Sequence, residues 1–192
     1  TNQIINIDGN FEGTLNNFKF DVSSLSSGDT NLSGLYFFEN LLHEEKSYYI
    51  NAKNHKISTS YFDMRRFMPR LLGESLPKEL KNLGNFTFVG TTEITEKELK
   101  TNSSIFSQIG SVKVDAKLGN INNSEKATYK GLINLNGFNL GKIAGTSSLG
   151  KISANLKIDG KGFTQKALDT EISGTISSLN FDRSTTYLQD KT

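Results

Sequence analysis

The chain has 192 residues, with 22 basic and 20 acidic side chains and a formal net charge of +2. Such balanced, interspersed charge argues against a nucleic-acid-binding surface. Cysteine is absent, which excludes disulfides and thiolate metal sites. No apolar run approaches the roughly 20 residues that a membrane helix needs. The chain begins without Met, so we expect a fragment or processed piece of a longer protein, with any membrane anchor outside it.

The first segment, residues 1–60, is predicted to be a β-repeat segment, with a hairpin turn at residues 8–10 (DGN). Its apolar-polar alternation is weakest at residues 36–38 and 43–56. Internal repetition supports the prediction: an apolar-x-Gly step is followed about ten residues later by an apolar-x-Ser/Thr step at 11–24, 88–101 and 158–170. A second repeat relates residues 83–86 (LGNF) to 149–152 (LGKI). Repetition at this spacing indicates an extended sheet that grows by added units.

Residues 61–84 are predicted to form a helical connector of two short helices. Apolar residues recur at helical spacing between Tyr61 and Leu72, and Ser75 is a plausible cap ahead of Pro77 for a second helix ending near Leu83. At about 1.5 Å per residue these helices are too short to cover a sheet of ten or more strands spaced about 4.8 Å apart.

Residues 85–182 are predicted to be the second β-repeat segment, in which apolar and polar residues alternate with a period of two. Such strands have one apolar face, which the two helices cannot fully cover. We therefore predict a mainly β fold: an extended, curved, U-shaped and largely antiparallel sheet with an apolar concave groove lined by aliphatic side chains. The predicted lining residues are Val112, Val114, Ala116, Leu118, Ile133, Leu135, Ile152, Ala154, Leu156, Ile158, Ile172 and Ile176.

The second half also carries a family resemblance. Residues 131–143 (GLINLNGFNLGKI), 149–152 (LGKI), 160–163 (GKGF) and 168–176 (LDTEISGTI) resemble the AsmA-like repeats of the TamB family. Residues 76–84 (LPKELKNLG) resemble the helical element before such repeats in relatives from Bacteroidetes-type bacteria. The similarity extends over roughly residues 8–181, and the order and spacing of the motifs carry it.

The resemblance implies a periplasmic protein, tied to the inner membrane by an N-terminal helix, with a taco-shaped sheet and an apolar groove. It implies phospholipid transfer between inner and outer membranes in outer-membrane biogenesis, with acyl chains and an Omp85-class outer-membrane protein as partners. An overlapping role is assistance in outer-membrane protein assembly and translocation. No nucleic acid, cofactor, metal or catalytic residue is expected.

Other motifs favour structural interpretations. Residues 145–151 (GTSSLGK) have P-loop spacing, but Ile152 replaces the Ser or Thr that binds magnesium, and a strand rather than a helix is predicted to follow. His43 with Glu44 and Glu45 cannot converge on one ion from a strand, so a solvated loop is expected. No nucleophile elbow or set of inward carboxylates indicates an enzyme.

Two alternatives of other classes stay open at this level. One is a structural β-solenoid or adhesin, whose repeats are normally shorter than the roughly 70-residue spacing here. The other is a fragment of an outer-membrane β-barrel, which shares the alternation but requires aromatic girdles. The polar tail, residues 183–192, is predicted to be a linker, a tag remnant or an edge strand.

Overall fold

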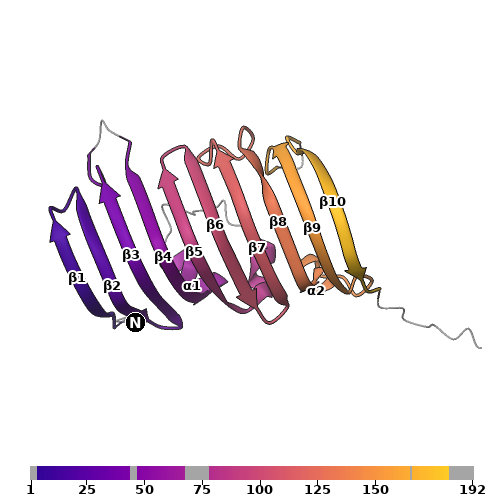
Figure 1. The fold of residues 1–192 in the computed structure, drawn as a ribbon, viewed down its shortest axis with the longest axis horizontal. Coiled ribbons are helices and arrows are strands. Elements are labelled where there is room, and N and C mark those ends of the chain that lie inside the picture. Colours follow the sequence, from indigo (N-terminus) through magenta and orange to yellow (C-terminus); the bar gives the residue numbers. More distant parts are fainter. Residues whose placement is uncertain (1–3, 44–46, 68–77, 165, 182–192) are drawn as a thin grey trace, which may run out of the picture.

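The structure is a computed structural model that describes residues 4–43, 47–67, 78–164 and 166–181. It contains one antiparallel sheet of ten strands whose spatial order is their order in the chain (Figure 1). The strands are β1 (Asn6–Gly13), β2 (Phe18–Ser27), β3 (Thr30–Glu39), β4 (Tyr49–Ser60), β5 (Asn85–Thr95), β6 (Glu98–Ser107), β7 (Gly110–Gly119), β8 (Thr128–Asn139), β9 (Lys151–Lys161) and β10 (Asp169–Leu179). The mainly β prediction is therefore confirmed, and both predicted β segments belong to the same sheet.

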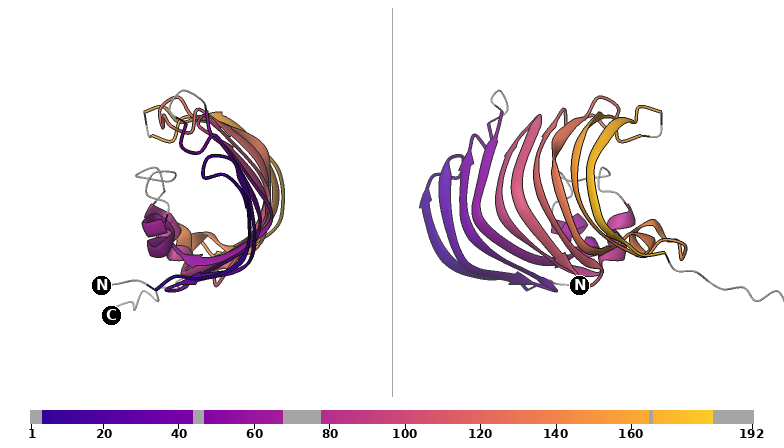
Figure 2. Two further views of the ribbon diagram at one scale, coloured as in Figure 1. Left: turned by 90° about the vertical axis from the view of Figure 1, so that its left-hand side faces the viewer. Right: turned by 45° about the vertical axis from the view of Figure 1, so that its right-hand side comes forward.

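In the described part of the chain, three short helices pack on one face of this sheet: α1 (Tyr61–Phe67), the 3-10 helix η2 (Lys78–Leu83) and α2 (Leu140–Ala144). The sheet is curved, and the helices lie on its concave side, near one end of the strands (Figure 2). We call the sheet face that the helices contact the inner face and the opposite one the outer face. No helix in the described part of the chain is long and apolar enough to cross a membrane.

The described parts of the predicted helical connector contain α1 and η2, of which the second is a 3-10 helix. The Ser60 hydroxyl accepts the backbone N–H of Asp63, at 3.2 Å, and so caps the start of α1. Phe62, predicted to belong to the apolar cluster, is exposed. The predicted cap at Ser75 and Pro77 lies outside the described residues.

Helix α2 was not predicted from the sequence, although its end signals are present. The Asn139 side chain accepts the backbone N–H of Lys142, and Gly145 ends the helix in the left-handed conformation, with φ of 69°. Only five residues separate these caps, too few to show helical periodicity.

Two sequence predictions for the first segment are corrected. Residues 8–10 lie inside β1 and form no hairpin turn. Gly9 is needed there for a close approach: a Cβ atom would meet the Asp21 carbonyl oxygen at 2.4 Å. The three apolar-x-Gly copies also occupy unequal places, since Gly13 ends β1 whereas Gly90 lies within β5. The second repeat, residues 83–86 and 149–152, does have a structural counterpart. Phe86 and Ile152 each lie at the start of a strand, and both are buried in the same core cluster.

A row of paired inner-face residues crosses all ten strands, and we call it the central row. Four of its ten members are glycine, at positions 9, 34, 90 and 174, and the others are Val22, His55, Ser103, Val114, Ile133 and Leu156. Side chains on the concave side of a bent sheet crowd one another, and glycine relieves that crowding. Six of the nine strand pairs also contain a register shift, which bends the strands further.

We predict that Gly34→Ala lowers the free energy of unfolding by about 1–3 kcal/mol. Gly34 has φ of 136°, and an added Cβ would lie 2.8 Å from the His55 Cα atom. Gly119→Ala is the matched control, because Gly119 has no positive φ and only the Thr128 hydroxyl lies near the added methyl group. Urea unfolding of both variants tests the prediction, and equal stability of the two would contradict it.

Candidate functional site

The twelve residues predicted to line a groove all lie on the inner face. Strand pairing places them in three rows: Val112, Leu135, Ala154 and Ile176 in one, Val114, Ile133 and Leu156 in the next, and Ala116, Ile158 and Ile172 in the third, with Gly131 between its first two members. Leu118 pairs with Tyr129 at one end of the strands, and Ile152 pairs with Phe138 at the other. The period-two alternation thus identified one continuous apolar surface across β7 to β10.

The helices cover part of this surface. A core cluster joins Leu83 of η2 to Phe86, Phe138, Ile152 and Ala154 of the sheet. Met64, Leu80, Leu140 and Ile143 from the helices pack against that cluster, as do Val112, Leu135 and Leu156 from the strands. The Asn82 side-chain amide donates to the Ile143 carbonyl at 3.1 Å and ties η2 to α2. Five of the predicted lining residues therefore belong to a packed core.

The other seven lining residues do not belong to this helix-packed core, and for that reason we call them the uncovered set: Val114, Ala116, Leu118, Ile133, Ile158, Ile172 and Ile176. Ala116 is buried, and Val114, Leu118, Ile133 and Ile158 are half-buried. Ile172 and Ile176, on the edge strand β10, are exposed over 61% and 58% of their surface. Large apolar side chains that stay this exposed are common at surfaces that receive an apolar partner. The uncovered set is the candidate binding surface of the chain.

The inner face of β1 to β3 is aromatic, which corrects the prediction of a uniformly aliphatic lining. Phe18 stacks on Phe38 with 4.4 Å between ring centroids, and Phe11 lies 4.8 Å from Phe18. A second core cluster of Val22, Tyr36 and Ala52 adjoins these rings. Burial raises the pKa of the Tyr36 phenol, whose hydroxyl donates to the Ser33 carbonyl. The sequence shows these rings at period two, and the alternation at residues 18–22 (FKFDV) was the signal that could have placed them on the inner face.

A chain of polar side chains separates the aromatic and aliphatic regions, and we call it the hydroxyl chain. His55 Nε2 lies 2.9 Å from the Thr92 hydroxyl, which is 3.0 Å from the Thr101 hydroxyl, which in turn is 2.7 Å from the Ser103 hydroxyl. Thr101 and Ser103 also donate to the Thr91 carbonyl. No local pattern in the sequence indicated this role for His55, because the four side chains meet only once β4, β5 and β6 are paired.

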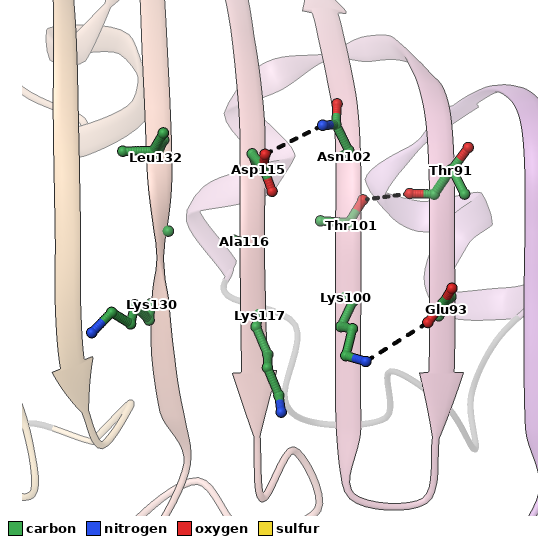
Figure 3. A pocket seen from close by; sticks show the side chains of 11 residues that line it. Thr91, Glu93, Lys100, Thr101, Asn102, Asp115, Ala116, Lys117, Lys130 and Leu132 are labelled. Carbon is green, nitrogen blue, oxygen red and sulfur yellow. Dashed lines mark hydrogen bonds and ion pairs between the residues drawn. The ribbon is translucent and has the colours of Figure 1, made fainter.

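The outer face carries charge, and a shallow depression crosses β5 to β8 there (Figure 3). Lys117 contacts Glu98 at 2.7 Å, Lys130 contacts Asp159 at 2.7 Å and Lys100 contacts Glu93 at 3.9 Å. The hydrogen bond from Lys117 lowers the pKa of the Glu98 carboxyl, and the bond to Asp159 raises the pKa of Lys130. Exposed pairs of this kind contribute little stability, so we interpret this face as a solvated surface.

The described residues contain no group of three or more His, Asp or Glu side chains that could hold a metal ion. Residues 44–46, in the segment considered for such a site, lie outside the described ranges. The strand β9 follows the sequence with P-loop spacing, in agreement with the structural interpretation of that motif. No family model, curated protein or solved structure matched this chain.

We predict that Thr92→Val lowers the free energy of unfolding by about 1–3 kcal/mol, because it leaves His55 Nε2 buried without a partner. Valine has nearly the volume of threonine and suits a strand, so the change isolates the lost hydroxyl. Thr91→Val, at the adjacent outer-face position, is the control and should change stability by less than about 0.5 kcal/mol. Chemical denaturation measures both, and similar losses would show that the hydroxyl chain is unimportant.

Proposed function

We propose that this chain is a segment of a periplasmic bridge for lipid transfer, with the apolar inner face as a groove that carries phospholipid between the inner and outer membranes. The observation that supports the proposal is the inner face itself: continuous apolar rows on a curved, open sheet, of which the helices cover only part. Burial of each CH₂ group of an acyl chain contributes about 0.8 kcal/mol, so an uncovered aliphatic row favours such a guest.

The arrangement suits sliding better than tight capture. The uncovered set consists of Val, Ala, Leu and Ile side chains, and they follow one another from strand to strand at similar spacing. Aliphatic rows offer many similar contacts and no single deep minimum, because apolar attraction is non-directional and scales with the area removed from water. In the proposed function the uncovered set contacts the acyl chains, and no catalytic residue takes part.

The TamB-like resemblance supplies the proposed context: anchoring to the inner membrane outside this segment and an Omp85-class outer-membrane partner. The alternative candidates are a role in outer-membrane protein assembly and translocation and a structural β-solenoid or adhesin. One observation favours these alternatives: among the described strands, β1 and β10 each pair on one side only, and they carry exposed apolar residues such as Phe11 and Ile172. Open strand edges bind other strands readily.

The first experiment is photo-crosslinking in cells with a benzophenone amino acid at Ile133 or at Leu132, in the full-length protein. The two positions are adjacent in β8, but Ile133 belongs to the uncovered set and Leu132 is an apolar residue exposed on the outer face. We expect a phospholipid adduct at Ile133 and none at Leu132. Protein adducts alone, or no difference between the positions, would contradict lipid transfer and favour the alternative candidates.

A charge in the groove tests the same proposal independently. Ile133→Asp should abolish the lipid adduct when the probe is moved to Ile158, because a passing acyl chain would have to desolvate the carboxylate at a cost of several kcal/mol. Asn134→Asp places the same carboxylate on the outer face and should leave the yield of adduct unchanged. Circular dichroism of both variants verifies that the sheet is retained. Equal tolerance of the two changes would argue against a groove.

A further inference from the structure

His55 has the largest fully buried side chain in the described part of the chain, with an exposed fraction of 1%. It lies on the central row, between the aromatic region of β1 to β3 and the aliphatic region of β7 to β10. Its ring stacks on Phe88 with 4.7 Å between ring centroids. An imidazole is therefore enclosed at the junction between the two apolar regions of the inner face.

The backbone around His55 is shaped to place its ring there. The register of β4 against β5 shifts between Ala52 and His55, where two residues of β4 lie opposite the single residue 91 of β5, so that β4 has one extra residue. Asn54, within this bulge, adopts a left-handed conformation with φ of 49°. Gly34 and Gly90 flank His55 on the neighbouring strands. A bulge of this kind redirects the following side chain, and such bulges concentrate at functional sites. Without the shift, the side chain at position 55 would face outward.

The ring is not fully satisfied by its surroundings. Nε2 is paired with the Thr92 hydroxyl, whereas Nδ1 is buried and makes no hydrogen bond of normal geometry, although backbone groups of Phe88 and of His55 itself lie near the ring. Buried polar atoms without partners are uncommon in proteins, and their retention indicates a role beyond packing. The neutral imidazole thus completes the hydroxyl chain through one nitrogen and leaves the other available for a proton.

No charged side chain of the described residues faces the ring. On β3, Tyr36 is the ionisable inner-face group near it, and burial raises the pKa of its phenol so that it stays neutral. The Lys and Glu side chains of β4, β5 and β6 lie on the outer face, where Lys53 contacts the Phe37 ring and Lys100 pairs with Glu93. On α1, Asp63 accepts the Asp29 backbone N–H, Arg65 lies over the Tyr61 ring and Arg66 is exposed.

We propose that His55 is a proton-sensitive latch of the inner face, which while neutral holds β4 and β5 packed and dry at the junction of the two apolar regions, and which loosens this junction when protonated; this inference rests on the proposed lipid-carrying function. Protonation would place a cation in the hydroxyl chain with no counter-ion, so water must enter or the β4–β5 contact must loosen. Either response admits water to the junction between the two apolar regions. The chemical consequence is weaker binding of an acyl chain at acidic pH.

The direction of the pH dependence follows from the pKa. Burial lowers the pKa of His55 below its ordinary value of about 6.5, an effect that backbone carbonyls of Phe88 and His55 itself oppose only in part. The open or unfolded state, in which the ring is hydrated, takes up its proton near pH 6.5. Below that pH the open state binds more protons than the closed state, so the closed state loses stability as the pH falls and is most stable above about pH 7.

The test is binding of a fluorescent fatty-acid probe to the purified chain between pH 7.5 and pH 5. We expect the affinity of the wild type to fall several-fold over this range, because the open state takes up a proton that the closed state excludes. His55→Gln keeps a neutral hydrogen-bonding side chain, and its affinity should change less than about twofold over this range. His43→Gln removes the other histidine of the chain, on the exposed loop, and should retain the full wild-type dependence.

A second readout separates the latch from the lipid function. The free energy of unfolding should decrease between pH 7 and pH 5 in the wild type and in His43→Gln, with a smaller decrease in His55→Gln. If no variant binds the probe at any pH but this difference in stability persists, the lipid proposal fails and the latch stands. If wild type and His55→Gln show the same pH dependence in both measurements, or imidazole NMR gives His55 a pKa at or above 6.5, the latch is overturned.

Discussion

The structure depends on the unbroken antiparallel ladder that joins ten strands into a single layer. Each strand pairs with its neighbour in sequence, so the ladder forms from local hairpins and from two longer connections that carry the helices. A single layer has two faces, and the short helices cover only one end of one of them. The need to accommodate the remaining apolar face shapes both the curvature of the sheet and its proposed use.

The central row both allows the sheet to bend and contains the buried imidazole of His55. Glycines and register shifts let the sheet bend, and the bulge in β4 turns His55 toward the inside of that bend. The aromatic region around Phe18 and Phe38 and the aliphatic region around Ile133 then lie on either side of a polar chain. In the proposed groove these are two apolar compartments joined at one titratable point.

Most strands of the second half, and the residues on their inner face, could be predicted because β7 to β10 have one polar, solvent-exposed face and one apolar face. At residues 112–118 and 152–158 every second side chain is aliphatic and the intervening ones are polar, so the alternation specifies both the strand and its inner residues. The strands of the first half and their inner faces were harder to predict from the sequence, since residues 22–25 and 52–55 contain bulges that interrupt the period of two. Gly9 resembled a turn residue but serves a close contact between strands, a distinction that depends on the partner strand.

Local sequence patterns are enough to specify a mainly β chain with one apolar face and too little helix to cover it, because alternation and helix length are local properties. Tertiary structure alone decided which lining residues the helices bury, since five of the twelve belong to the core around Leu83 and Phe138. It also assembled the hydroxyl chain, whose members are up to 48 residues apart (positions 55 and 103). Strand pairing sets these contacts, and no local pattern encodes the pairing partner or the register shift that points His55 inward.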